Sequence, residues 1–264
     1  MKIDKLTSMH KSDLEALFPK LDVSHVPNLN GYSWEEWHEG SLGAGDCFLA
    51  DEMAQKLNLT PGMRVLDLGS GRGYNSCFLA KHYGVEIYAV DAFANPADIA
   101  AIAAKKGVAN KVIPIRADAK NMPFADGFFD AVLSLNAFFY FGTDDTYLPY
   151  LARFLKPSAL LCVTSPCFSR EPDNETPAHF MFDSPDYIEF YAIHSPQWWK
   201  QHFVKYRNIA LLSCEEHPLG REIWLDSLRW QMQTRPLPDI WNDLNMLYWD
   251  TERFVTYFSL LARF

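Results

Sequence analysis

The chain of 264 residues lacks several features that would assign it to common classes of protein. No stretch reaches the ~18 consecutive apolar residues of a transmembrane helix, and the first twenty residues hold no apolar run of the kind found in secretory leaders. The five cysteines are widely spaced and form no Cys-x-x-Cys pair, which argues against a zinc knuckle or a disulfide framework. We therefore predict a reduced, cytoplasmic protein with no metal site and no membrane partner.

Clusters of basic residues are also missing. The net charge is −9, and the basic residues are scattered, with only short pairs such as Lys105-Lys106. An acidic chain repels a nucleic-acid backbone unless basic residues are concentrated in one patch. Nucleic acid is therefore disfavoured as a partner.

Apolar and aromatic residues are abundant, at 48% and 15%, so a large core is expected. From residue 63 onward, short apolar runs alternate with helical patterns. Strands are expected at 63–68, 85–90, 111–116, 129–135 and 159–165. Helices are expected between them at 74–82, 95–107 and 145–154. Such alternation is typical of an α/β protein, in which helices cover both faces of a mostly parallel sheet.

Four segments are expected along the chain. An N-terminal arm or lid at 1–43 precedes a core at 44–165. The proline-rich, aromatic segment 166–206 is too long for an ordinary connection and is predicted to be a lid insertion that binds the acceptor. Residues 207–264 are expected to add Trp-rich helices and two further strands, which makes seven strands in all.

The stretch VLDLGSGRG follows the first expected strand and contains Gly69, Gly71 and Gly73. Glycine accepts positive φ and removes Cβ from the surface, so a ligand can approach the backbone. A phosphate-binding loop would need a lysine after the last glycine, and a dinucleotide fingerprint would need glycine where Tyr74 stands. The remaining pattern is an acidic residue, Asp67, two places before the first of three alternating glycines.

That pattern resembles the signature of class I S-adenosylmethionine-dependent methyltransferases, in the small-molecule branch. The resemblance covers roughly residues 45–165 and continues, in order, through YAVDA, RADAKNMPF, FFDAVLS and LKP. It implies a Rossmann-like, doubly wound fold. It also implies S-adenosyl-L-methionine as cofactor and S-adenosyl-L-homocysteine as product.

The resemblance also implies roles for particular residues. Asp91 would hold both ribose hydroxyls, and Asp118 would meet the adenine amino group. In phosphoethanolamine-type enzymes, a tyrosine closes over the methionine end and a small-residue turn touches its carboxylate. The implied cofactor-binding residues are Tyr32, Ser41, Gly43, Asp67, Gly69, Ser70, Gly71, Gly73, Asp91, Ala92, Asp118, Ala119 and Asn136. Alternatives are an exposed arm packed by its tryptophans for 32–43, and a turn-forming role for Asn136.

The expected function is in-line transfer of a methyl group to a small-molecule acceptor. A general base is needed only if the acceptor arrives protonated. His38, His179, His194 and Tyr140 are the candidates, of which His179 in the expected lid is favoured, and Tyr140 should line the site. One alternative is a regulator or sensor that binds the cofactor without turnover, and a less favoured one is a nucleic-acid methyltransferase. The acceptor, its nucleophilic atom and the oligomeric state stay open.

Overall fold

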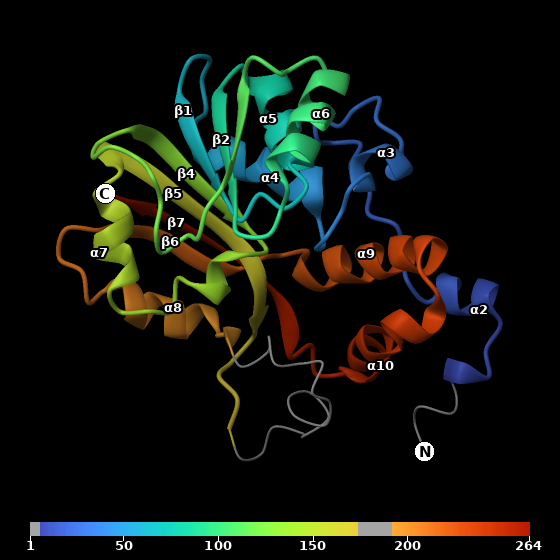
Figure 1. The fold of residues 1–264 in the computed structure, drawn as a ribbon. Coiled ribbons are helices and arrows are strands. Elements are labelled where there is room, and N and C mark those ends of the chain that lie inside the picture. The colour runs from blue at the N-terminus through green and yellow to red at the C-terminus, as the bar shows by residue number, and fades with distance from the viewer. Residues whose placement is uncertain (1–5, 174–191) are drawn as a thin grey trace.

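A seven-stranded sheet forms the centre of the computed structural model, which describes residues 6–173 and 192–264 (Figure 1). The strand order is β3-β2-β1-β4-β5-β7-β6. The strands are β1 (Arg64–Leu68), β2 (Glu86–Asp91), β3 (Val112–Arg116), β4 (Phe129–Leu135), β5 (Leu155–Phe168), β6 (Ala210–Glu216) and β7 (Val255–Arg263). Strands β1 to β5 are parallel, and β7 runs antiparallel to both its neighbours. The predicted mostly parallel, Rossmann-like sheet is confirmed.

Helices cover both faces of this sheet, as the alternating sequence predicted. One face carries α4 (Asp46–Lys56), α5 (Tyr74–Tyr83) and α6 (Pro96–Lys105), and the other carries α7 (Tyr147–Ala152) and α8 (Pro196–Phe203) (Figure 1). Successive residues of a strand point to opposite faces. Accordingly, Val65 belongs to the apolar core under α4 and α5, whereas Leu66 belongs to the core under α7 and α8.

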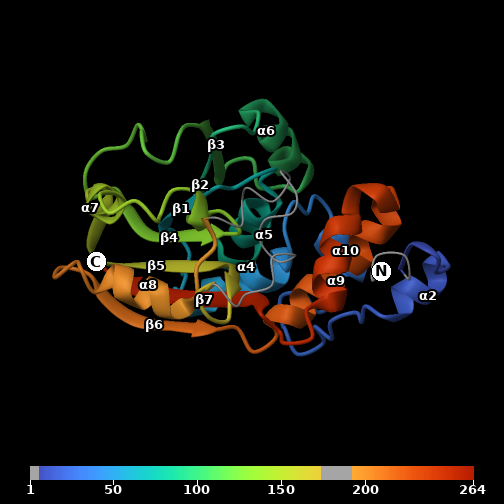
Figure 2. The same cartoon turned by 90° about the horizontal axis from the view of Figure 1, so that it is seen from below.

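The N-terminal arm and the C-terminal helices meet at one end of the sheet, where α2, α9 and α10 lie together (Figures 1 and 2). The guanidinium of Arg229 on α9 donates to the carbonyl oxygens of Glu15 and Phe18 and so joins the arm to α9. The helices of this region are α2 (Lys11–Ala16), α3 (Trp34–His38), α9 (Gly220–Thr234) and α10 (Trp241–Trp249), with the short 3₁₀ helix η4 (Leu237–Ile240). A second 3₁₀ helix, η1 (Phe138–Tyr140), follows β4.

Local sequence signals explain where several helices begin. The Asn95 side chain accepts a hydrogen bond from the backbone N–H of Ala97 at 3.1 Å, and Pro96 takes the first position of α6. The N-terminal arm predicted at 1–43 contains the helix α3. The reason is a capping box, in which Ser33 and Glu36 bond each other's backbone N–H groups.

Strand β5 is longer than the predicted 159–165, because β7 pairs with it as far as Phe168. Its proline, Pro166, lies beyond Thr164, the last residue that pairs with β4. A proline is tolerated where no neighbouring strand needs its N–H. The strand therefore continues past a residue that, by sequence alone, suggested its end.

Within the residues that the structure describes, no helix is both long enough and apolar enough to cross a bilayer.

Candidate functional site

A cavity of about 910 Å³ opens at the carboxyl ends of β1, β2 and β4. The strand order reverses between β1 and β4, which is where open α/β sheets bind their ligands. One part, here called the glycine-turn half, is lined by Gly43, Asp46, Gly69, Ser70, Gly71, Asp91, Ala92, Phe93, Asp118, Ala119 and Asn136. The other part, called the α9 half, is lined by Phe139, Tyr140, Pro166, Ile193, Trp224, Ser227, Gln231, Arg235, Asp243 and Tyr257.

The turn after β1 needs its glycines for two reasons. Gly69 and Gly71 have φ of +82° and +53°, which favours glycine. A Cβ at Gly69 would lie 2.3 Å from Cβ of Ala137, and one at Gly71 would lie 2.9 Å from Cδ1 of Leu42. The turn is fixed to the end of β2, because the N–H groups of Gly69 and Ser70 both donate to the carbonyl oxygen of Val90. The result is a rigid stretch of bare backbone along the cavity.

Asp91 anchors this turn from the end of β2. Its Oδ2 accepts a hydrogen bond from the Gly71 N–H at 2.9 Å, and its Oδ1 accepts from Phe93 and Ala94 at 2.8 and 2.9 Å. A carboxylate oxygen has about two lone-pair positions. Oδ2 therefore keeps capacity for a further donor, and the residue lines the cavity. The site can bind a hydroxyl group here without rearranging the turn.

Asp67 lies behind the turn and does not line the cavity. Alternate residues of a strand point to the same face of the sheet, so Asp67 lies on the same face as Val65. There it accepts a hydrogen bond from the hydroxyl of Ser76 on α5. Burial raises the pKa of Asp67 to about 6, and the nearby charge of Asp91 adds to this, while the bond from Ser76 opposes it. In the structure this carboxyl fastens α5 to β1.

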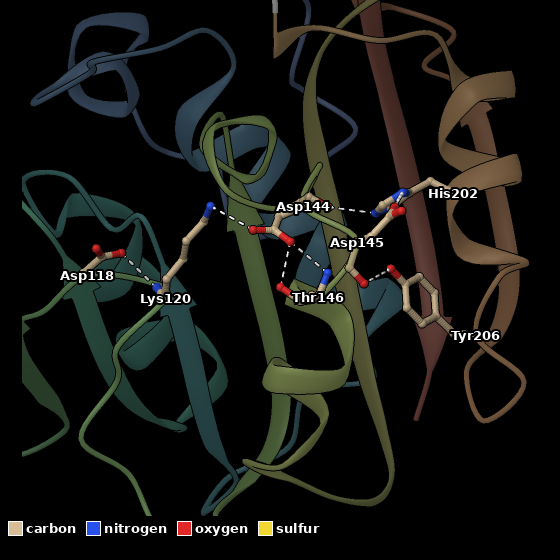
Figure 3. A network of polar contacts seen from close by, with 8 residues as sticks. Asp118, Lys120, Asp144, Asp145, Thr146, His202 and Tyr206 are labelled. Carbon is tan, nitrogen blue, oxygen red and sulfur yellow. Dashed lines mark hydrogen bonds and ion pairs between the residues drawn. The ribbon is translucent and has the colours of Figure 1, made fainter.

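Asp118 begins a chain of polar contacts along the edge of the cavity (Figure 3). Its Oδ1 accepts from the backbone N–H of Lys120, whose ammonium lies 3.3 Å from Oδ2 of Asp144. Hydrogen bonds from the hydroxyl and N–H of Thr146, together with Lys120, lower the pKa of Asp144 to about 2. These contacts hold the loop after β3 against the loop that follows η1.

The same network continues to α8 through Asp145 (Figure 3). Oδ1 of Asp145 lies 3.4 Å from Nδ1 of His202, and its carbonyl oxygen accepts from the hydroxyl of Tyr206. Nε2 of His202 lies 3.0 Å from the carbonyl oxygen of Gly142, so this nitrogen must carry the hydrogen. Burial lowers the pKa of His202. The loop that carries Tyr140 is thereby held between β4 and α8.

Asn136 joins the N-terminal arm to the sheet. Its φ is +57°, a conformation that asparagine tolerates better than most residues. Its Nδ2 donates to the carbonyl oxygen of Ala44 at 2.9 Å, and its N–H donates to that of Thr164. A Cβ at Gly43 would lie 2.4 Å from the same Nδ2, so glycine is required for this close contact.

Most of the predicted site residues come together around the cavity. Those that line it are Gly43, Gly69, Ser70, Gly71, Asp91, Ala92, Asp118, Ala119, Asn136 and Tyr140. Those that do not line it are Tyr32, Ser41, Asp67 and Gly73. His179 lies outside the described residues. The roles of all these residues stay predictions.

The residues that do not line the cavity have other contacts. The Tyr32 hydroxyl lies 3.0 Å from Nε2 of His82, and the ring packs on Phe78. A Cβ at Gly73, which precedes α5, would lie 2.5 Å from Cγ2 of Ile99, so this glycine permits close packing of α5 on α6.

Two of the candidate histidines are held by acidic side chains. His38 is fully buried, and its Nε2 lies 2.7 Å from Oδ2 of Asp226. Nδ1 of His194 lies 3.1 Å from Oε2 of Glu171, next to the cavity-lining Ile193.

Asp46 and the polar residues that line the cavity from α9 were not predicted from the sequence. Ser227 and Gln231 lie four residues apart on α9 and so share one side of the helix, and Arg235 follows as the extended residue just after its end. Ser227 and Gln231 immediately precede Leu228 and Met232, which belong to the core. A polar stripe beside an apolar one is the signal that could have pointed to a cavity wall.

Comparison with known proteins identifies the central part of the chain. Residues 65–158 match the family model of a methyltransferase domain, which spans the glycine turn, Asp91 and Asp118. This match places a methyltransferase domain at residues 65–158, in agreement with the predicted resemblance to class I S-adenosylmethionine-dependent methyltransferases. The methyltransferase domain thus contains most of the glycine-turn half, while α9 and β7 lie outside it.

Curated relatives share little more than this methyltransferase domain. A probable chloroplastic tocopherol O-methyltransferase of Oryza sativa subsp. japonica is 32% identical over 114 residues, which are 42% of this chain and 32% of that protein. The chain spans less than half the length of this and similar curated relatives.

Solved structures with the same fold cover more of the chain. A geranyl diphosphate methyltransferase in complex with GPP and sinefungin has a TM-score of 0.68 and 14% identity, covering 99% of this chain and 98% of that one. The [4+2]-cyclase SpnF has a TM-score of 0.64 and 20% identity, covering 83% and 80%. At such identities the likeness establishes the fold alone, and the cyclase illustrates that one fold serves different reactions.

Proposed function

We propose that this chain binds S-adenosyl-L-methionine in the cavity, transfers its methyl group to a small-molecule acceptor and releases S-adenosyl-L-homocysteine. The observation that carries the proposal is the bare-backbone turn of Gly69 and Gly71, anchored by Asp91 at the strand-order reversal. The match of residues 65–158 to a methyltransferase domain supports it independently.

The glycine-turn half fits the nucleoside of this cofactor. Oδ2 of Asp91 has the acceptor capacity that a ribose hydroxyl needs. The neighbouring Phe93 lines the cavity with 88% of its side chain exposed, which provides an apolar surface for the adenine ring. Asp118 lines the same edge and offers an acceptor to the adenine amino group.

The α9 half is the proposed acceptor pocket. Trp224, Ser227 and Gln231 line it from α9, and Tyr140 lines it from η1. Pockets that combine aromatic walls with a few polar groups bind small organic molecules. The acidic net charge of −9 further favours such an acceptor over a nucleic acid.

The bound cofactor supplies a methyl group that its positive sulfonium has already activated. The residues of this chain then have to align the acceptor and exclude water, and alignment of this kind lowers a barrier by ~7–11 kcal/mol. Among the residues that the structure describes, Tyr140 is the candidate for the group that contacts the acceptor or takes its proton. His179 remains the other proposed base, outside the described residues.

A cytoplasmic location is part of the proposal. It is supported by the cysteines, all five of which are buried thiols in the described residues and form no disulfide there.

Turnover with methyl-labelled cofactor tests the proposed reaction. The protein is incubated with labelled S-adenosylmethionine and fractions of a small-metabolite extract, and Asp91→Ala serves as the matched inactive variant. We expect label to appear in a small molecule, with stoichiometric S-adenosylhomocysteine. Tight cofactor binding without transfer to any fraction would instead support a cofactor-binding regulator.

A further inference from the structure

Asp46 is a buried acid in the cavity wall. It is 7% exposed, lines the glycine-turn half, and takes the first position of α4. Its Oδ2 is fully buried and has no hydrogen-bond partner among the described residues. A buried charged oxygen without a partner is costly, so such an atom in a binding cavity points to a missing ligand group.

Neighbouring groups do not satisfy this oxygen. The hydroxyl of Ser41, which lies close to the carboxyl, has one hydrogen and donates it to the carbonyl oxygen of Gly43 at 2.6 Å. Asn75 and His38 offset only part of the effect of burial, which raises the pKa of Asp46 to about 6. Asp46 is therefore a buried acid with one oxygen that has no hydrogen-bond partner among the described residues.

Two other acids of the glycine-turn half are engaged differently. Asp91 accepts three backbone N–H groups, and the exposed Asp118 accepts that of Lys120. Asp46 alone among these three carboxyls combines deep burial with an oxygen that lacks a partner in the described residues. It is the one suited to bind a cation.

The position of Asp46 indicates which part of the ligand it meets. Asn136 binds the carbonyl oxygen of Ala44, two residues before Asp46, and a Cβ at Gly69 would touch Ala137. Asp46 therefore lies on the side of the turn near Gly69, whereas Asp91 binds the side at Gly71. A nucleoside whose ribose is at Asp91 would extend its other end toward Asp46.

We propose that Oδ2 of Asp46 binds the α-ammonium group at the amino-acid end of the cofactor. This inference rests on the proposed function, because it needs a nucleoside that carries a primary ammonium. The subsite is an addition to the residues implied by the family resemblance, and it assigns Asp46 to binding rather than to proton transfer from the acceptor.

Calorimetry with two ligands tests this assignment. S-adenosylhomocysteine carries the ammonium, whereas 5′-methylthioadenosine has the same nucleoside and sulfur but no amino acid. Charge-assisted hydrogen bonds of this kind correspond to ~10–100-fold in affinity. Asp46→Asn should therefore weaken S-adenosylhomocysteine binding by that factor and change methylthioadenosine binding by less than about twofold.

The control variant is Glu52→Gln, on the same helix but away from this cavity, where Glu52 pairs with His217. It should leave both affinities unchanged. Equal losses for the two ligands in Asp46→Asn, or no loss for either, would overturn the assignment. Failure of the unmodified protein to bind either ligand would instead overturn the proposed function, and the ammonium subsite with it.

Discussion

The two halves of the cavity are built in different ways. Most of the glycine-turn half is made by short turns at strand ends, joined by Gly43 before α4 and Asp46 at its start, and Asp91 is bonded to backbone N–H groups no more than twenty residues away. The α9 half is assembled from η1, β5, α9, α10 and β7, which extend from Phe138 to the C-terminal strand. One half is thus largely a local structure, whereas the other requires elements from distant parts of the chain.

This difference separates two properties of the protein. A local turn can be kept in many proteins with different acceptors, because it depends on few distant contacts. A wall built from distant elements can change with any of them, and apart from Phe139 and Tyr140 it lies outside the matched residues 65–158. We therefore expect variants of the first half to change cofactor affinity, and variants of the second to change acceptor affinity.

The largest effect is expected for Asp91→Ala. This change removes the proposed ribose acceptor and leaves the N–H groups of Gly71, Phe93 and Ala94 without their partner. Loss of hydrogen bonds to a charged group should weaken S-adenosylhomocysteine binding by about 100-fold in calorimetry. Asp98→Ala, at the exposed start of α6, controls for the lost charge. Unchanged affinity in Asp91→Ala would remove the ribose assignment.

A smaller loss, about 10–30-fold, is expected for Gly69→Ala. The new Cβ would overlap Ala137 and displace one side of the cavity, and overpacking of this kind costs about 1–3 kcal/mol. Gly107→Ala is the matched control, because its φ is +76° but a Cβ there would meet no atom within 4 Å. Both variants carry the backbone strain, so equal cofactor affinities would show that the bare backbone is not required.

Gln231→Leu in the α9 half should weaken binding of the methyl acceptor rather than of the cofactor. Gln231 lines the proposed acceptor pocket, and its leucine variant keeps a similar size but loses the amide. We expect KM for the acceptor found by the labelling experiment to rise about fivefold or more, as for the loss of one neutral hydrogen bond. The control is Gln233→Leu, at an exposed position of the same helix, which should leave this KM unchanged. A change in cofactor affinity instead would break the division between the two halves.

The smallest effect concerns stability and pH. Because the pKa of Asp46 rises from 3.8 to about 6 on folding, its contribution favours the folded state below pH 3.8 and is lost as the pH rises through about 6. Asparagine does not ionise, so Asp46→Asn does not lose this stability as the pH rises. Without ligand, Asp46→Asn should have a higher melting temperature than the unmodified protein at pH 7.5. The gain in the free energy of unfolding should be at most on the order of 3 kcal/mol.

The gain in Asp46→Asn should shrink toward pH 4, and scanning calorimetry across this range measures it. Asp98→Asn should show no comparable gain. A lower melting temperature of Asp46→Asn at pH 7.5 would mean that the carboxylate already has a stabilising partner in the apo protein.

The fold and the glycine-turn half were largely predictable because their signals are local. Gly69, Gly71 and Asp91 lie at strand ends, and the strands are continuous apolar runs bounded by turns. The alternation of β and α elements then leaves few topologies. The register extension of β5 past Pro166 was not predictable, since it depends on pairing with β7, about 90 residues further along the chain.

The α9 half could not be predicted for a related reason. Trp224 and Gln231 carry no motif, and their place in the cavity follows from how α9 packs on β7 and α3. Tyr32, predicted to close over the cofactor, packs on Phe78 of α5 and does not line the cavity, and its role stays a prediction. Long-range packing decides such positions, and one sequence does not encode it in a pattern that can be recognised locally.

A crystal structure with S-adenosylhomocysteine tests the central claim most directly. We predict that the nucleoside lies along Gly69 and Gly71, with a ribose hydroxyl bonded to Oδ2 of Asp91 and the sulfur facing the α9 half. A ligand bound away from this turn, or a ribose with no contact to Asp91, would contradict the account.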